Sequence, residues 1–233
     1  MTDVQVKICG ITNSHDAKAA LEAGADYLGF ILYPKSPRYI PWEKIKQVIL
    51  DSRYWIADRS ASSPNTPYPI SNTPKFVGGF VNESVAHITE ILAFTGLDYA
   101  QLHGDEPPGF LQPLSGKAFK AVRPADEEGA RHAAARFAPH GLDDGPQLLI
   151  DAYDPAEYGG TGKKANWHVA RELAQRYPRL MLAGGLTPAN VAQAIRAVRP
   201  WAVDVSSGVE ASPGRKDHDA VRAFIRAAKE SKQ

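Results

Sequence analysis

The sequence predicts a single (β/α)8 barrel of the TIM type, and three observations support this α/β fold class. Short apolar runs alternate with helical stretches along the whole chain, in eight units. The chain has 233 residues, of which 43% are hydrophobic and 23% charged, and this suits one domain around one core. The apolar runs are short and nearly unbroken, as in parallel strands that are buried on both faces. A doubly wound open sheet is the alternative, although it usually needs fewer units.

The expected strands are short apolar runs bounded by turn-forming residues. They lie at residues 4–8, 27–32, 75–81, 99–102, 118–122, 147–150, 180–182 and 201–205. The expected helices follow them, and the clearest repeat apolar residues at the i, i+3, i+4, i+7 spacing of one buried face. Their ranges are 15–23, 41–50, 85–92, 107–114, 126–137, 170–177, 191–198 and 221–228. Eight strands with a helix after each would close into a barrel.

We expect one domain over residues 1–233, with one irregular segment inside it. Residues 58–74 are rich in Ser and Pro and have no period, which predicts a long loop between the second helix and the third strand. A loop that follows a helix and precedes a strand lies at the N-terminal face of a barrel, so it should lie opposite the active site.

The charge and composition argue against several kinds of partner. The formal net charge is only +1, which does not favour nucleic acid or a membrane surface. The first residues lack the pattern of a signal peptide, and no apolar run is long enough to span a bilayer. The single cysteine cannot form an intrachain disulfide, which fits the reducing cytoplasm. We therefore expect a cytoplasmic protein that acts on a small molecule. As a separate expectation, we predict a monomer rather than a dimer.

Polar residues follow most of the expected strands, at the ends where barrel enzymes carry their chemistry. In chain order they are Cys9, Asn82, His103, Arg123, Asp151, Gly184, Gly185 and Asp204. The other histidines are scattered and match no metal-binding spacing, so we expect no metal.

Glycine-bearing turns follow the last three expected strands, at residues 159–163, 183–187 and 206–208. Glycine lets backbone N–H groups approach an anion closely, and a following helix adds positive partial charge. One such turn could be only a turn, but three on one face predict a phosphate site. Its residues would be Gly160, Gly162, Gly184, Gly185, Ser206, Ser207 and Gly208. Glu157 and Ala165 stand where a Walker motif and a dinucleotide motif need glycine, so we expect neither ATP nor NAD.

Cys9 and Asp151 are the candidate proton-transfer groups. A lone cysteine is usually a small buried apolar residue, but at a strand end that faces a barrel mouth it could be a base or a nucleophile. Asp151 follows three apolar residues and could cap a helix or pair with a donor. In a partly buried mouth, however, the pKa of its carboxyl group could rise far enough to make it a proton donor.

Arg38, His103 and Asp204 are the candidate substrate-binding side chains. Arg38 lies in a proline-stiffened loop after the second strand, where it could grip a carboxylate through two hydrogen bonds. A solvated surface arginine is the alternative. His103 could line the site or could be a structural histidine. Asp204 ends the eighth strand and faces the same mouth.

The chain resembles the phosphoribosylanthranilate isomerase family. The matching blocks are KICGIT at 7–12, GADYLGF at 24–30, SPRY at 36–39, QLHG at 101–104, GGTGK at 159–163, LAGGLTP at 182–188 and VDVSSGVE at 203–210. They follow the order of the family and cover nearly the whole chain. The sequence departs from the family pattern in its long 58–74 segment and at Ala165, where an aromatic residue is usual.

The resemblance implies a cofactor-independent Amadori rearrangement of a phosphorylated aminoaldose in tryptophan biosynthesis. It assigns ring-opening proton donation to Asp151, removal of the sugar C2 proton to Cys9, and the anthranilate carboxylate to Arg38. Two rivals stay open: another sugar-phosphate isomerase or epimerase of the barrel class, and a non-catalytic sensor of a phosphate ligand. A sensor would need the phosphate site without both proton-transfer groups.

Overall fold

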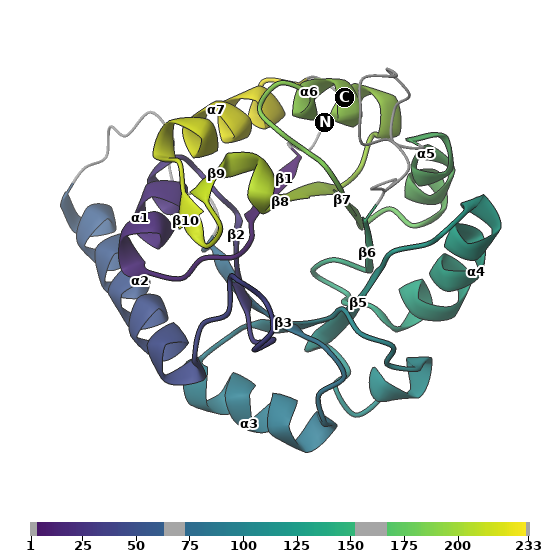
Figure 1. Cartoon of the computed structure of the whole chain (residues 1–233), viewed down its shortest axis with the longest axis horizontal. Helices are drawn as coiled ribbons and strands as arrows, with labels where there is room; N and C mark the ends of the chain where they lie inside the picture. Colours follow the sequence, from purple (N-terminus) through teal and green to yellow (C-terminus); the bar gives the residue numbers. More distant parts are fainter. Residues whose placement is uncertain (1–3, 63–72, 152–166, 232–233) are drawn as a thin grey trace.

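The computed structural model describes residues 4–62, 73–151 and 167–231, and the side chains of these residues except 59–62. Eight parallel strands form a closed barrel in sequence order, ringed by helices (Figure 1), which confirms the predicted fold class. The strands are β1 (Gln5–Ile8), β2 (Tyr27–Ile31), β3 (Lys75–Phe80), β4 (Tyr99–Leu102), β5 (Ala118–Val122), β6 (Leu148–Asp151), β7 (Leu180–Ala183) and β8 (Ala202–Val205). Each lies within a residue or two of its predicted range.

The helices that cover the barrel bury one apolar face each. They are α1 (Ser14–Glu22), α2 (Trp42–Ser62), α3 (Val85–Thr95), α4 (Glu127–Phe137), α5 (Trp167–Arg176), α6 (Val191–Val198) and α7 (His218–Lys229). Among these described helices, none is both long and apolar enough to cross a membrane. Short 3₁₀ turns are η1 (Pro108–Phe110), η2 (Ala138–His140) and η4 (Ser207–Val209).

Two predicted segments need correction. The loop predicted at 58–74 does not start at residue 58, because α2 continues to Ser62. The buried stripe of Ile45, Val48 and Ile49 goes on through the half-buried Trp55 and Ile56, so the helix still has apolar surface to pack. Residues 63–72 of that prediction lie outside the described residues. The helix predicted at 107–114 is only the η1 turn, since two consecutive prolines and a glycine cannot sustain it.

The barrel has two apolar layers. Val6 and Ile8 of β1 pack outward against the helices, whereas Tyr27, Phe119 and Met181 fill the interior of the barrel. Because side chains alternate along a strand, Lys7 points inward between Val6 and Ile8, and Cys9 follows on the same side. The alternation therefore directs the side chains of Lys7 and Cys9 toward the barrel mouth.

The barrel closes between its first and last strands. β1 pairs with β8 in parallel, and the register places Lys7 opposite Asp204. A small antiparallel hairpin, β9 (Glu210–Ser212) with β10 (Arg215–Lys216), follows β8 and was not predicted. It carries Glu210 and Lys216, and Glu210 contacts Arg38 in the loop after β2.

Candidate active site

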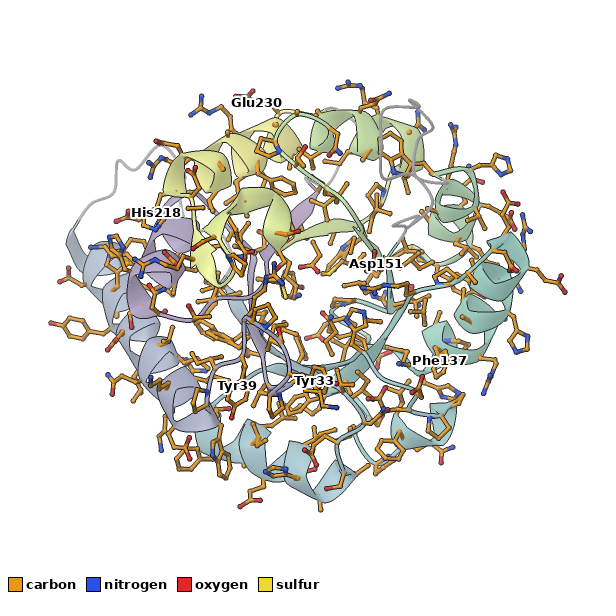
Figure 2. All side chains as sticks on the ribbon, in the orientation of Figure 1. Tyr33, Tyr39, Phe137, Asp151, His218 and Glu230 are labelled. Carbon is orange, nitrogen blue, oxygen red and sulfur yellow. The ribbon has the colours of Figure 1, made fainter. Side chains whose placement is uncertain are left out.

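A cavity of about 1150 Å³ opens at the carboxyl ends of the strands. Every predicted site residue within the described ranges lines it: Cys9, Arg38, His103, Asp151, Gly184, Gly185, Asp204, Ser206, Ser207 and Gly208. Gly160 and Gly162 lie outside the described residues. Figure 2 shows Asp151 at the central opening of the ring. The structure thus brings residues from six strands and the loops after them to one place.

Cys9 is buried immediately after β1, and its backbone N–H donates to Val205 O of β8 at 2.8 Å. Burial is the largest influence on the thiol and raises its pKa above the usual value. The Lys7 and Lys216 ammonium groups act in the opposite direction, because they favour the thiolate. The cysteine therefore lies beside two buried cations that oppose the cost of ionising it.

Lys7 lies beside Cys9 and was not predicted as a site residue. Its side chain is 1% exposed, and its Nζ lies 2.9 Å from Asp204 Oδ1. Burial lowers the pKa of Lys7, but Asp204 and Cys9 outweigh it, so the pKa is raised and the amine stays charged. The strand alternation could have found it, since Lys7 is an inward position between two outward apolar residues.

Gly29 of β2 makes room for this group. A Cβ on Gly29 would lie 2.8 Å from Cys9 Sγ and 3.0 Å from Lys7 Nζ. Cys9 Sγ and Lys7 Nζ therefore both lie against Gly29, and a larger residue at this position would displace them. The second glycine of the GADYLGF block is explained by this close approach.

Asp151 ends β6, and its side chain is 12% exposed. Its Oδ2 accepts two hydrogen bonds from Arg123, from Nε at 3.1 Å and from Nη2 at 2.9 Å. The Arg123 side chain is 63% exposed. Arg123, which is largely exposed and also lines the cavity, therefore orients the Asp151 carboxylate at the cavity wall.

Arg38 is held by Glu210 of the unpredicted hairpin. Arg38 Nε donates to Glu210 Oε1 at 2.8 Å, and Nη2 donates to Oε2 at 2.7 Å. Burial alone would raise the pKa of Glu210, but Arg38 and Lys216 hold it below its usual value. The carboxylate is thus ionised, and it fixes one edge of the guanidinium while Nη1 forms the other edge. Glu210 is the last residue of the VDVSSGVE block, and its place in that block could have identified it as a site residue.

The carboxyl end of β4 contributes two side chains. Gln101 Nε2 and His103 Nδ1 lie 3.4 Å apart, and both residues line the cavity. Burial is the largest cause of the lowered pKa of His103, so the imidazole is neutral near pH 7. Gln101 Oε1 is buried with no hydrogen-bond partner among the described residues. A buried polar atom of this kind is costly unless a ligand or water satisfies it.

The predicted phosphate turns meet at the carboxyl ends of β7 and β8. Gly184 and Gly185 adopt φ of 103° and 61°, a region that favours glycine. A Cβ on Gly208 would lie 1.9 Å from Leu186 O, so only glycine allows the two turns to touch. Ser206 Oγ is buried and has no hydrogen-bond partner among the described residues. This hydroxyl and the turn backbones form a polar cradle that fits an anion.

Asn82, which the sequence placed among the strand-end residues, is not part of the cavity lining. Its Oδ1 accepts from Asp105 N at 2.7 Å, and it thereby supports the loop after β4. A buried ion pair, Lys120 Nζ to Glu106 Oε2 at 2.9 Å, also supports this loop. These contacts fix the position of His103 and are structural.

Comparison with known proteins finds relatives over nearly the whole chain. The family model described as N-(5'phosphoribosyl)anthranilate (PRA) isomerase matches residues 6–227. N-(5'-phosphoribosyl)anthranilate isomerases of Trichlorobacter lovleyi and Thermotoga maritima are 45% and 40% identical, over 98% and 97% of this chain and 99% and 98% of theirs. The crystal structure of phosphoribosyl anthranilate isomerase from Thermotoga maritima superposes with a TM-score of 0.79 at 39% identity, covering 97% of this chain and 98% of that one. A second structure, in complex with reduced 1-(o-carboxyphenylamino)-1-deoxyribulose 5-phosphate, gives 0.76 at 37% identity, with the same coverage. The chain belongs to the N-(5'-phosphoribosyl)anthranilate isomerase family.

Proposed function

We propose that the chain converts N-(5'-phosphoribosyl)anthranilate to 1-(2-carboxyphenylamino)-1-deoxyribulose 5-phosphate, a cofactor-independent Amadori rearrangement in tryptophan biosynthesis. The observation that carries the proposal is that Cys9, Asp151, Arg38 and the polar cradle all line one cavity. This is the set that the reaction needs: a base, an acid, a carboxylate clamp and a phosphate site. A family relative binds a reduced form of the product.

The two ends of the substrate orient it in the cavity. The phosphate would bind in the cradle of Gly184, Gly185 and Ser206, where backbone N–H groups and the buried Ser206 hydroxyl are available. The anthranilate carboxylate would bind the Nη1 edge of Arg38, which Glu210 holds in place. Anchoring both ends places the ribose between Cys9 and Asp151.

The reaction then proceeds by proton transfers alone. Protonated Asp151 gives its proton to the ring oxygen, the C1–O bond breaks, and the nitrogen lone pair forms a C1=N iminium. The Cys9 thiolate removes the C2 proton, and that electron pair forms the C1=C2 bond and neutralises the nitrogen. The enol hydroxyl loses its proton as C1 gains one, which leaves the C2 ketone. The positive iminium acidifies the C2–H bond and stabilises the thiolate beside it.

Fluorescence assay of phosphoribosylanthranilate with the purified chain tests the function. We expect catalytic turnover with loss of the substrate fluorescence and appearance of the rearranged ketone. Binding without turnover would favour the sensor alternative. Absence of both, in a chain whose circular dichroism is that of a folded α/β protein, would contradict the proposal and direct the search to another sugar phosphate.

The assembly and location of the protein stay predictions. We expect a monomer, although a Thermotoga maritima relative is described as dimeric. We also expect the cytoplasm, because the pathway is biosynthetic. Light scattering at several protein concentrations checks the first, and fractionation of the source cells checks the second.

A further inference from the structure

A second cluster of chemically active side chains lies outside the cavity, at the N-termini of α1 and α7. It consists of His15, Asp16 and His218. One ligand atom from each residue can be chosen such that all three lie within 4.8 Å of one another. None of the three lines the active-site cavity. Figure 2 places His218 at the outer rim of the ring, away from Asp151.

The carboxylate of Asp16 is buried and already oriented. Its Oδ2 accepts from Lys216 N at 3.0 Å and from Asn13 Nδ2 at 2.9 Å. These bonds turn Oδ1 toward His218, whose Nε2 lies 2.8 Å away. Outer hydrogen bonds that fix a ligating carboxylate in this way are a regular feature of metal sites. One oxygen is therefore anchored to the fold, and the other faces the imidazoles.

The two imidazoles lie against each other beside that oxygen. The ring centroids of His15 and His218 are 4.6 Å apart, with planes inclined by 56°. His15 is exposed, and the His218 side chain is 24% exposed. The pair can thus be reached from solvent, and His15 can turn at small cost.

Sequence spacing predicted no metal site, but the fold brings together residues from both ends of the chain, and we propose that His15, Asp16 and His218 form a binding site for a divalent transition metal such as Zn²⁺. Two imidazole nitrogens and one carboxylate oxygen are the donors that Zn²⁺ accepts, and water can take a fourth position. Bond lengths near 2.0–2.1 Å at a tetrahedral angle separate two ligand atoms by roughly 3.3 Å. The Nε2 to Oδ1 distance of 2.8 Å therefore has to open by only about 0.5 Å. The metal takes the place of the proton between these atoms, and neutral His218 then carries its single proton on Nδ1.

One effect opposes binding. Two helices begin at this site, and the positive partial charge of their N-termini disfavours a cation. The Asp16 carboxylate and the N-cap carboxylate of Asp217 act against that charge. The metal would tie the first helix of the barrel to the last, beside the closure of β1 on β8.

Titration of the tag-free full chain with Zn²⁺ by isothermal calorimetry, after treatment with EDTA and desalting, tests the proposal. We expect one equivalent to bind and the melting temperature to rise with added Zn²⁺. Exposed His15 can be changed without disturbing the fold, and His15→Ala should weaken binding by roughly tenfold or more, the loss typical of even an outer partner. His218→Ala should do the same.

Two control variants make the result decisive. His87 is a partly exposed histidine whose Nδ1 lies 3.2 Å from Glu83 Oε2, so His87→Ala removes a comparable pair elsewhere and should leave Zn²⁺ binding unchanged. Cys9→Ala should also leave it unchanged, because the thiol belongs to the active-site cavity. The proposal is overturned if no equivalent binds, if His15→Ala and His218→Ala bind as tightly as the wild type, or if Cys9→Ala alone abolishes binding.

Discussion

At the scale of single residues, the reactivity of Cys9 depends on the charges that surround it. Burial raises the pKa of the thiol, and a deeply buried lysine beside it has the opposite effect. The sequence predicted Cys9 from its position at a strand end. It did not predict Lys7, although strand alternation marks that residue as an inward position, because Lys7 pairs with Asp204 from the other end of the chain only when the barrel closes.

Lys7→Met tests that electrostatic role. The change removes the nearest cation and leaves Asp204 unpaired, and both effects raise the pKa of Cys9. Since the reaction needs the thiolate, the ascending limb of kcat/KM against pH should move to higher pH. Lys120→Met removes another buried, paired lysine and should leave this limb in place. An unmoved limb in Lys7→Met would show that the lysine only supports the fold.

Glu210 is a positioning residue that works through Arg38. Arg38→Met should lower kcat/KM by about 1.5–3 kcal/mol, the range for a hydrogen bond to a charged group. Glu210→Gln should lower kcat/KM by roughly tenfold or more through misplacement of the guanidinium, mainly by raising KM. The double variant should be no worse than Arg38→Met, because the two residues act as one unit. Additive losses would contradict this account.

At the scale of elements, the sequence predicted every strand of the barrel, because buried parallel strands leave a clear apolar signal. It ended the second helix too early, since the continuing stripe at Trp55 and Ile56 is interrupted by charged neighbours. It also missed the β9–β10 hairpin, whose few residues are exposed or charged and have no apolar period. That hairpin supplies Glu210 and Lys216. Because it has no apolar period, these two residues of the site were not predicted either.

The contact between the turns after β7 and β8 gives a prediction for the phosphate site. In Gly208→Ala the new methyl group would meet the backbone carbonyl of Leu186, which cannot rotate away. The turns must separate, so we expect a loss of about 1–3 kcal/mol in unfolding free energy and a higher KM. Gly109→Ala meets nothing within 4 Å and is the matched control. Equal behaviour of the two variants, by urea unfolding and steady-state kinetics, would refute the close contact.

At the scale of the whole molecule, the ends of the chain meet where the barrel closes, and a buried carboxylate joins them. Burial tends to raise the pKa of Asp16, but hydrogen bonds from Lys216, His218 and Asn13 outweigh it and hold the pKa below its usual value. The fold class was predictable from composition and alternation alone. The hydrogen bonds of Asp16 with Lys216 and His218 were not predictable, because they join residues about two hundred positions apart.

The lowered pKa of Asp16 predicts that the stability of the fold is sensitive to acid. Its contribution to stability is present above the unfolded-state pKa of about 3.9 and is lost as pH falls through the lower folded value. In EDTA-treated protein, the free energy of unfolding should therefore fall more steeply with acidification in the wild type than in Asp16→Asn. Urea unfolding at a series of pH values measures this. Parallel curves for the two proteins would mean that the ionised Asp16 carboxylate contributes nothing to the free energy of unfolding.

The central claim is that Cys9 and Asp151 transfer the protons of an Amadori rearrangement. The most direct measurement is kcat for phosphoribosylanthranilate turnover in Cys9→Ala and Asp151→Asn, each shown to be folded. Each should lose roughly a hundredfold or more, the scale of general acid–base assistance. KM should change little, because the carboxylate clamp and the phosphate cradle are left intact. Near-wild-type turnover in either variant would contradict the assignment of that residue and the mechanism with it.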